Sequence, residues 1–356
     1  MFYFYGVNIH QKYILRSIQL GKKGLGSTAP NPMVGCTIVC DGQIIGEGYT
    51  SPYGGPHAEV NAINAVKDKD QLSQATLYVT LEPCSHHGKT PPCADLIVKH
   101  NIPQVVIGLK DPHSKVAGAG IQKLKNSGCK VMVGVLEEEC REHHRRFLYF
   151  HEKNRPYIIL KWAETQDGFM APHRKNRSAD PEPFWITNTY SKQMVHQWRG
   201  EEQAILVGTK TVLEDNPKLN TRDWAGKNPV RVILDKNLKI PPDFHVMDGT
   251  VKTIVLTTVS DASKYIDGID YETIDFSKPI GLQVCNVLFG HSITSVLIEG
   301  GSKTLQTFID EGLWDEARIF TGPSRFGEGV AAPKINGSLR ETKSILSDTL
   351  SILRHD

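Results

Sequence analysis

The sharpest chemical pattern in the sequence combines a histidine, a glutamate and two cysteines: His57, Glu59, Cys84 and Cys93. Imidazole nitrogen and thiolate sulfur are ligands that zinc prefers, and three protein ligands leave a fourth position for water. Zinc lowers the pKa of such a water to about 7, so that it can attack a ring carbon bearing an amino group. We therefore predict that His57, Cys84 and Cys93 bind zinc. Glu59 is the predicted proton shuttle between the water, the ring nitrogen and the departing ammonia.

The spacing of the two cysteines differs from that of the general zinc nucleobase deaminases. Those enzymes carry H-x-E followed by P-C-x-x-C, whereas eight residues, SHHGKTPP, separate Cys84 from Cys93. Two other interpretations therefore stay open at this point. The histidine and the cysteines are ordinary core side chains, or they form a structural zinc site in which His86 or His87 supplies a fourth ligand.

A second pattern, in the other half of the chain, suits an anion. The segment LIEGGS at 297–302 is an expected strand that leads through Gly300 and Gly301 into an expected helix. Backbone N–H groups at such a helix start can bind a phosphate. Gly208 and Thr209 follow another apolar run and permit close approach of a ligand to the backbone. Neither place has the G-x-G-x-x-G fingerprint, so an ordinary strand-to-helix turn is the alternative.

Alternating helical and apolar segments predict an α/β domain in each half. In the first half, Asp41-Gly42 supplies the positive φ angles of a tight hairpin turn, and the expected strands and helices are 10–20, 34–40, 43–49, 57–66, 76–80, 93–100, 104–108, 120–126, 130–134 and 137–146. In the second half, the expected strands are 157–162, 204–208, 230–234, 253–257, 295–299 and 316–320. The charged segment 145–156 separates the halves, so the predicted domains are 1–150 and 151–356.

Composition limits the classes of partner. The 356 residues carry 41 Lys and Arg against 39 Asp and Glu, a net charge of +2, which gives no broad electrostatic surface for nucleic acid or an anionic membrane. No apolar run approaches the roughly 20 residues of a membrane span, and the first residues do not resemble a signal peptide. Seven scattered cysteines argue against a disulfide framework. We expect a cytoplasmic enzyme with a small-molecule substrate.

Three segments of the first half carry a family resemblance: NPMVGC at 31–36, PHAEVNAI at 56–63 and VTLEPCSHHGKTPPCAD at 79–95. They resemble the deaminase domain of the bifunctional riboflavin-biosynthesis deaminase-reductases, in which the long loop between the two cysteines is itself a family feature. The resemblance implies a cytidine-deaminase-like α/β/α layered domain with a mixed sheet. It also implies a diaminopyrimidinone substrate that carries a ribosylamino 5′-phosphate. The implied substrate contacts are Asn31, His86 and Lys89.

The second half is similar to the reductase domain of the same family, in LKWAETQDG at 160–168, WITN at 185–188, AILVGTKTVLEDNPKLNTR at 204–222 and VLIEGG at 296–301. The resemblance implies a dihydrofolate-reductase-like α/β fold and NADPH-dependent reduction of the ribosyl group to a ribityl chain. The implied substrate contacts are Lys161, Thr187, Arg199, Asp215, Arg222 and Glu299, with Arg199 and Arg222 on the phosphate. The implied cofactor contacts are Gly208, Thr209, Gly300 and Gly301. Asp215 and Lys161 are the candidate proton donors.

The sequence departs from the family pattern at two single positions and in one insertion. Thr50 stands where the family usually has a histidine, Gln166 replaces an apolar residue, and a polar insertion occupies 172–183. The departures in the second half leave one alternative to be tested, a deaminase with an impaired reductase-like domain. Two other hypotheses are also to be tested. One is a deaminase of nucleosides or nucleic acid, and the other is a non-enzymatic zinc domain joined to a nucleotide-binding scaffold. The residues leave open whether it forms a homo-oligomer.

Overall fold

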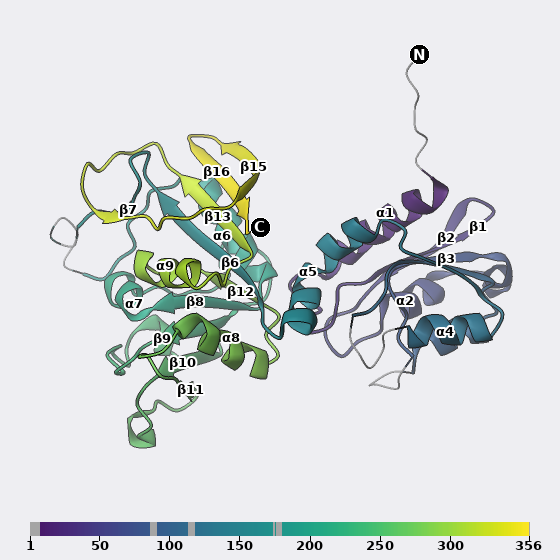
Figure 1. Cartoon of the computed structure of the whole chain (residues 1–356), viewed down its shortest axis with the longest axis horizontal. Coiled ribbons are helices and arrows are strands. Elements are labelled where there is room, and N and C mark those ends of the chain that lie inside the picture. The colour runs from purple at the N-terminus through teal and green to yellow at the C-terminus, as the bar shows by residue number, and fades with distance from the viewer. Residues whose placement is uncertain (1–7, 86–90, 113–117, 174, 176–179, 356) are drawn as a thin grey trace, which may run out of the picture. The chain divides into compact units, whose positions relative to one another are not determined.

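The computed structural model describes residues 8–85, 91–112, 118–173, 175 and 180–355. The chain divides into two compact units, Met1–Asn154 and Arg155–Asp356, which Figure 1 shows as a cartoon. Both units are α/β, as the sequence predicts. Within the described ranges, none of the helices combines the length and the apolar composition that a bilayer crossing requires.

Unit 1 is built on a five-stranded mixed sheet with the order β2-β1-β3-β4-β5. The central strands β3 and β4 and the edge strand β5 are parallel, whereas β1 runs antiparallel to both β2 and β3. The predicted hairpin between β1 and β2 is present, and its turn residues Asp41 and Gly42 both have positive φ. The strands are β1 (Gly35–Cys40), β2 (Gln43–Tyr49), β3 (Thr76–Leu81), β4 (Gln104–Leu109) and β5 (Lys130–Val133).

Helices cover both faces of this sheet (Figure 1). The helices are α1 (Ile9–Gly21), α2 (Ala58–Ala65), α3 (Cys93–Lys99), α4 (Ala119–Asn126) and α5 (Glu137–Lys153), with 3-10 turns at Lys22–Gly24 and Lys69–Gln74. One face carries α1 and α5, and the other carries α2 and α4, both of which α3 contacts. The sequence predicts that the last of these helices, α5, ends at residue 146 and that a separating segment follows at 145–156. The helix end is wrong, because α5 continues to Lys153. Apolar side chains of this extension pack on the unit, and Leu148 and Phe150 are buried.

Unit 2 contains a nine-stranded sheet with the order β11-β10-β9-β8-β12-β6-β13-β16-β15. The strands from β11 to β13 are parallel, and the final hairpin β15–β16 joins them antiparallel. The strands are β6 (Tyr157–Glu164), β8 (Ala204–Gly208), β9 (Val230–Leu234), β10 (Thr253–Thr257), β11 (Asp270–Thr273), β12 (Ser295–Ile298), β13 (Glu316–Thr321), β15 (Ser338–Ile345) and β16 (Asp348–Arg354), with a separate pair β7 (Phe169–Ala171) and β14 (Val330–Ala331).

Side chains that alternate along the parallel strands build a core on each face of the sheet. On β8, Leu206 belongs to one buried cluster with Trp162 and Phe308, whereas its neighbours Ile205 and Val207 belong to the other. Burial on both faces explains why these strands read as continuous apolar runs. The helices are α6 (Thr189–Glu201), α7 (Thr209–Asp215), α8 (Ile280–Gly290) and α9 (Ser302–Asp310), with 3-10 turns at His245–Met247 and Ala262–Lys264.

Candidate active sites

The three predicted zinc ligands converge in unit 1. The ligand atoms of His57, Cys84 and Cys93 all lie within 4.8 Å of one another. His57 Nδ1 is 3.4 Å from Cys93 Sγ and 3.6 Å from Cys84 Sγ, and the Cys93 backbone N–H donates to Cys84 Sγ at 3.3 Å. Local structure brings them together: His57 is the residue before α2, Cys93 is the first residue of α3, and Cys84 follows the end of β3.

The spacing of these donors fits zinc. A tetrahedral ion with Zn–N near 2.0–2.1 Å and Zn–S near 2.3 Å holds its nitrogen and sulfur ligands roughly 3.5 Å apart, which matches both separations from His57 Nδ1. In the part of the chain that the structure describes, this cluster consists of the three predicted residues. His86 and His87, the alternative fourth ligands, lie outside the described residues, as does Lys89.

Glu59 lies in the first turn of α2 and is buried, with 3 % of its surface exposed. Burial and the neighbouring Cys84 sulfur raise the pKa of Glu59 to about 7. Hydrogen bonds from Cys93 and from His57 lower the pKa of the Cys84 thiol, which favours the thiolate form of this sulfur. The arrangement therefore places a carboxyl group that exchanges protons near neutral pH beside a thiolate ligand.

The surrounding polar residues hold the strand ends that carry the zinc ligands. The buried Glu82 carboxylate accepts hydrogen bonds from the N–H groups of Asp111, Gly118 and Ile121 at 3.0–3.3 Å. His144 Nε2 lies 3.0 Å from Thr80 Oγ1. The sequence patterns did not predict these supports, although Glu82 lies within the segment 79–95 that carries the family resemblance.

Two predicted features lie in the loops next to β1. Asn31, a predicted substrate contact, is half-buried in the loop before β1, where its backbone N–H donates to the Thr28 carbonyl at 3.0 Å. Thr50, the departure from the family, is buried and its hydroxyl oxygen accepts the Val34 N–H at 3.1 Å. Thr50 therefore supports the loop rather than presenting an exposed ring contact.

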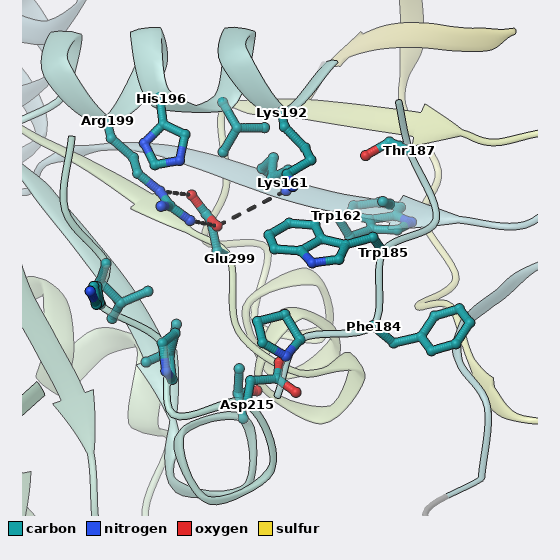
Figure 2. A pocket seen from close by; sticks show the side chains of 18 of the residues that line it. Lys161, Trp162, Phe184, Trp185, Thr187, Lys192, His196, Arg199, Asp215 and Glu299 are labelled. Carbon is teal, nitrogen blue, oxygen red and sulfur yellow. Dashed lines mark hydrogen bonds and ion pairs between the residues drawn. The ribbon is translucent and has the colours of Figure 1, made fainter. Parts of the chain in front are cut away.

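In unit 2, the predicted substrate contacts gather around one cavity of about 430 Å³ at the carboxyl ends of the parallel strands (Figure 2). Its lining includes all six of them: Lys161, Thr187, Arg199, Asp215, Arg222 and Glu299. They come from β6, the segment before α6, α6 itself, α7, the loop after α7 and the end of β12. Open α/β sheets bind ligands at this edge.

An ion pair lies at the centre of this cavity (Figure 2). Arg199 donates to both carboxylate oxygens of Glu299 at 2.7 and 2.9 Å, and Lys161 Nζ lies 4.0 Å from the same carboxylate. Burial opposes ionisation of Glu299, but the charges of Arg199 and Lys161 outweigh it and lower the pKa of the carboxyl to about 2. Burial lowers the pKa of Lys161. The remaining guanidinium nitrogen of Arg199 lies 3.4 Å from the Asn220 carbonyl, so the protein itself engages every nitrogen of Arg199.

A second cavity, of about 850 Å³, adjoins the first, because Asp215 and Glu299 line both. Gly208, Thr209 and Gly301 line it, together with Ser302, Lys303 and Thr304 at the start of α9. Gly301 has a φ of +38° and precedes α9 without a side-chain cap.

Two of the predicted cofactor residues make contacts within the protein. The Thr209 hydroxyl donates to the Leu234 carbonyl at 2.6 Å. Gly300 packs against the backbone of β8, where a Cβ would lie 2.8 Å from Gly208 N and closer still to Val207 Cα. The need for glycine at 300 therefore comes from strand packing.

Sequence analysis missed three further residues that line the first cavity: Trp185, Lys192 and His196. Lys192 Nζ lies 3.6 Å from the centre of the Trp185 ring. His196 precedes Arg199 by one helical turn on α6, and this spacing is the signal that could have identified it. Gln166, the other departure, is exposed and accepts a hydrogen bond from Arg325 Nε at 3.2 Å, so it does not enter the core. The insertion 172–183 lies partly outside the described residues.

Comparison with known proteins assigns both units. Residues 7–109 match the cytidine and deoxycytidylate deaminase zinc-binding region, and residues 156–350 match the RibD C-terminal domain. The chain is 39 % identical over 341 residues to the riboflavin biosynthesis protein RibD of Actinobacillus pleuropneumoniae, covering 91 % of this chain and 86 % of that one. It is also 39 % identical to RibD of Aquifex aeolicus, covering 91 % of this chain and 89 % of that one.

Solved structures agree over nearly the whole chain. A diaminohydroxyphosphoribosylaminopyrimidine deaminase/5-amino-6-(5-phosphoribosylamino)uracil reductase of Thermotoga maritima superposes with a TM-score of 0.88 at 39 % identity, covering 98 % of this chain and 99 % of that one. RibD of Acinetobacter baumannii superposes with a TM-score of 0.87 at 33 % identity, covering 97 % and 98 % of the two chains. The predicted family and the predicted fold of both domains are confirmed.

Proposed function

The chain belongs to the RibD family of riboflavin-biosynthesis deaminase-reductases, and from this premise we propose that its two units act on one phosphorylated pyrimidine in succession. Unit 1 hydrolytically deaminates 2,5-diamino-6-ribosylamino-4(3H)-pyrimidinone 5′-phosphate. Unit 2 then reduces the ribosyl group of the product to ribityl with NADPH. The observation that carries this proposal is the convergence of His57, Cys84 and Cys93 beside the buried Glu59. The bifunctional activity is favoured over deamination alone because the reductase family model also matches.

In unit 1, His57, Cys84 and Cys93 would hold a zinc ion, which when bound would supply a Lewis acid that makes water nucleophilic near neutral pH. Glu59 would accept one proton of the attacking water and deliver it to the ring nitrogen. It would then carry the proton of the new hydroxyl to the amino group, which leaves as ammonia while the ring carbonyl forms. A carboxyl with a pKa of about 7 serves this role because a proton-transfer group works best when its pKa lies near the working pH. Burial of Glu59 keeps bulk water from competing for the proton.

In unit 2, NADPH supplies the hydride and the protein supplies position and charge. Gly301 and Ser302 at the start of α9 would offer backbone N–H groups to the phosphates of the cofactor. Glu299 lines both cavities and would lie between bound cofactor and substrate. Lys161 and Asp215 are the candidate donors of the proton that the sugar oxygen takes up. The ordinary pKa of a lysine is too high for this role, and burial of Lys161 lowers it.

We propose a small phosphorylated pyrimidine as the partner, and neither nucleic acid nor a membrane, because a net charge of +2 offers no extended basic surface. A cytoplasmic location stays a prediction from the sequence.

The test combines metal analysis with a coupled assay on the phosphorylated diaminopyrimidinone. We expect one zinc per chain, release of ammonia without NADPH, and oxidation of NADPH once the deaminated product has formed. Glu59→Gln should lower ammonia release by a factor of roughly 10² to 10⁴ while zinc content stays unchanged. Glu47→Gln, which alters a partly exposed carboxylate paired with Arg16, is the control and should keep wild-type turnover.

Three results of this assay would count against the proposal. Ammonia released only from cytidine or single-stranded DNA would replace the proposed substrate. Loss of zinc in Glu59→Gln would contradict the shuttle role. Absence of NADPH oxidation despite deamination would show that the chain has only the deaminase activity.

A further inference from the structure

We propose that His196 is a positioning residue for the reductase substrate: its imidazole holds the turn at Arg222 and Asp223 against α6 and so presents Arg222 to the substrate phosphate. This inference rests on the proposed function of unit 2, because it names the side chain that organises the phosphate end of that site. The sequence motifs did not include His196.

The contacts of His196 specify which ring nitrogen donates and which accepts. The backbone N–H of Arg222 lies 3.4 Å from Nδ1 and donates to it, so Nδ1 is the acceptor. With Nδ1 as the acceptor, a neutral ring carries its hydrogen on Nε2, and Nε2 lies 3.2 Å from Asp223 Oδ2. One buried imidazole, 3 % exposed, therefore contacts two consecutive residues of the turn, through a hydrogen bond to the first and a close polar contact with the second.

The imidazole is neutral at physiological pH. Burial, together with the charges of Arg199 and Arg222, lowers the pKa of His196 to about 4. A protonated ring would carry a hydrogen on both nitrogens, and Nδ1 could no longer accept from the Arg222 backbone. Burial and the two nearby arginines thus keep the imidazole neutral, and the neutral imidazole is the form that can accept the Arg222 N–H.

Arg222 is the arginine available to the phosphate. Arg199, the other predicted phosphate contact, is engaged by Glu299 and Asn220. Arg222 lines the same cavity, its side chain is 38 % exposed, and its Nη1 donates to the neutral amide oxygen Asn220 Oδ1 at 3.4 Å, whereas Arg199 donates to a carboxylate through two nitrogens. Its nearest carboxylate is Asp223, whose Oδ2 is 3.8 Å from Arg222 Nε and closer, at 3.2 Å, to His196 Nε2. The Asp223 carboxylate thus lies nearer to His196 than to Arg222, and its ion pair with the Arg222 guanidinium is a long one.

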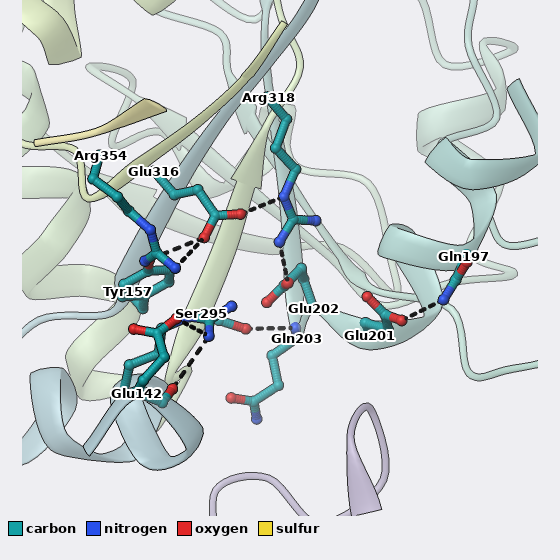
Figure 3. Close-up of polar contacts among 11 residues, drawn as sticks. Glu142, Tyr157, Gln197, Glu201, Glu202, Gln203, Ser295, Glu316, Arg318 and Arg354 are labelled. Carbon is teal, nitrogen blue, oxygen red and sulfur yellow. Dashed lines mark hydrogen bonds and ion pairs between the residues drawn. The ribbon is translucent and has the colours of Figure 1, made fainter. Parts of the chain in front are cut away.

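Helix α6, which carries His196, is held at its carboxyl end by contacts that do not involve the turn, among them the contacts of Arg318 with Glu316 and Glu202 (Figure 3). Arg318 Nε donates to Glu316 at 2.5 Å, and Arg318 Nη2 lies 3.6 Å from Glu202 at the end of α6. The Arg318 guanidinium also lies 4.6 Å from the centre of the Trp198 ring on α6. A change at His196 should therefore release the turn and leave α6 in place.

The test measures binding of ribose 5-phosphate, a probe of the phosphate end, by calorimetry in the full chain saturated with NADPH. His196→Phe should raise the dissociation constant roughly tenfold. This is the size expected when Arg222, no longer held in place, loses its hydrogen bond to the charged phosphate. His196→Asn, whose Oδ1 can replace Nδ1 as the acceptor, should recover part of the loss. Adding Asp223→Ala to His196→Phe should recover more, because the competing carboxylate is gone.

A double-mutant cycle separates positioning from a general structural effect. Arg222→Gln should weaken ribose 5-phosphate binding, and His196→Phe in that background should add almost nothing. Lys227→Gln, which removes an exposed lysine from the same turn, is the matched control and should bind as the wild type does. In the reductase assay, His196→Phe should raise KM and leave kcat within about twofold, and NADPH affinity should stay unchanged.

The inference is overturned if His196→Phe binds ribose 5-phosphate as the wild type does, if its effect adds fully to that of Arg222→Gln, or if NADPH affinity falls in parallel. Absence of ribose 5-phosphate binding in the wild type would overturn it as well. Binding that depends on His196 and Arg222 in a chain that does not reduce the pyrimidine would refute the proposed function and keep the sugar-phosphate site. Normal reduction with an unchanged KM in His196→Phe would refute the positioning role of His196 and leave the proposed function intact.

Discussion

The buried pair of Arg199 and Glu299 leads to a strong prediction about stability, because two nitrogens of Arg199 donate to the Glu299 carboxylate in a site with little access to water. Replacing Glu299 by glutamine keeps the size of the side chain and removes its charge. The Arg199 guanidinium, only 11 % exposed, then stays buried without a counter-ion, next to the Lys161 ammonium. Removal of one partner from a buried pair typically costs about 3–5 kcal/mol.

The pKa of Glu299 gives a second route to the same magnitude. The folded-state value of about 2 lies below the ordinary glutamate value of about 4.3, and this difference corresponds to about 3 kcal/mol. Because the folded value is depressed, the stabilisation is complete above pH about 4.3 and is lost as the pH falls toward 2. For a unit of roughly 200 residues, 1 kcal/mol shifts the melting temperature by about 2–4 °C. We expect Glu299→Gln to melt about 10 °C lower.

The assay is thermal unfolding at pH 7, with the transition of unit 2 identified by its response to NADPH. Asp270→Asn is the matched control: it removes one charge from the exposed pair with Lys252, at 3.4 Å, and should shift melting by at most about 2 °C, since exposed pairs contribute about 0–1 kcal/mol. A Glu299→Gln transition within 2 °C of the wild type would refute the reasoning. So would a Glu299→Gln variant whose stability still falls between pH 4.3 and 2 as steeply as that of the wild type.

Two further predictions concern other buried groups. Burial lowers the pKa of His143 to about 4, so unit 1 should lose about 3 kcal/mol of stability as the pH falls from 6.5 to 4; urea unfolding at several pH values should show a shallower loss in His143→Gln. Gly300→Ala should destabilise unit 2 by about 1–3 kcal/mol, because its Cβ would contact the Val207 backbone. Gly290→Ala, with open space around its Cβ, should melt at or above the wild-type temperature, and equal melting of the two alanine variants would contradict the packing argument.

The fold was predictable where burial leaves a pattern in the sequence. The central strands of both sheets were expected within a few residues, since they are buried runs of apolar side chains. The hairpin of β15 and β16 was missed, because the side chains of β15 are largely exposed and its charged residues hide the strand. The edge strand β11 (DYET) was also missed, because it lacks an apolar run, whereas the similarly exposed edge strand β5 (KVMV) was expected from its apolar residues. An edge strand without an apolar run is defined by its backbone hydrogen bonds to the neighbouring strand, and these bonds leave no pattern in the sequence.

The sites divide along a similar line. The zinc ligands could be predicted because each lies at the start of a helix or just beyond a strand, within short segments of recognisable spacing. The partner of Arg199 could not, because Glu299 is 100 positions away and the pairing depends on β12 lying opposite α6. The resemblance named both arginines as phosphate contacts, yet identical side chains receive different partners: Arg199 meets a carboxylate, whereas the carboxylate nearest Arg222 is held by His196. A motif specifies which charges are present, and the tertiary fold decides which of them remain available to a ligand.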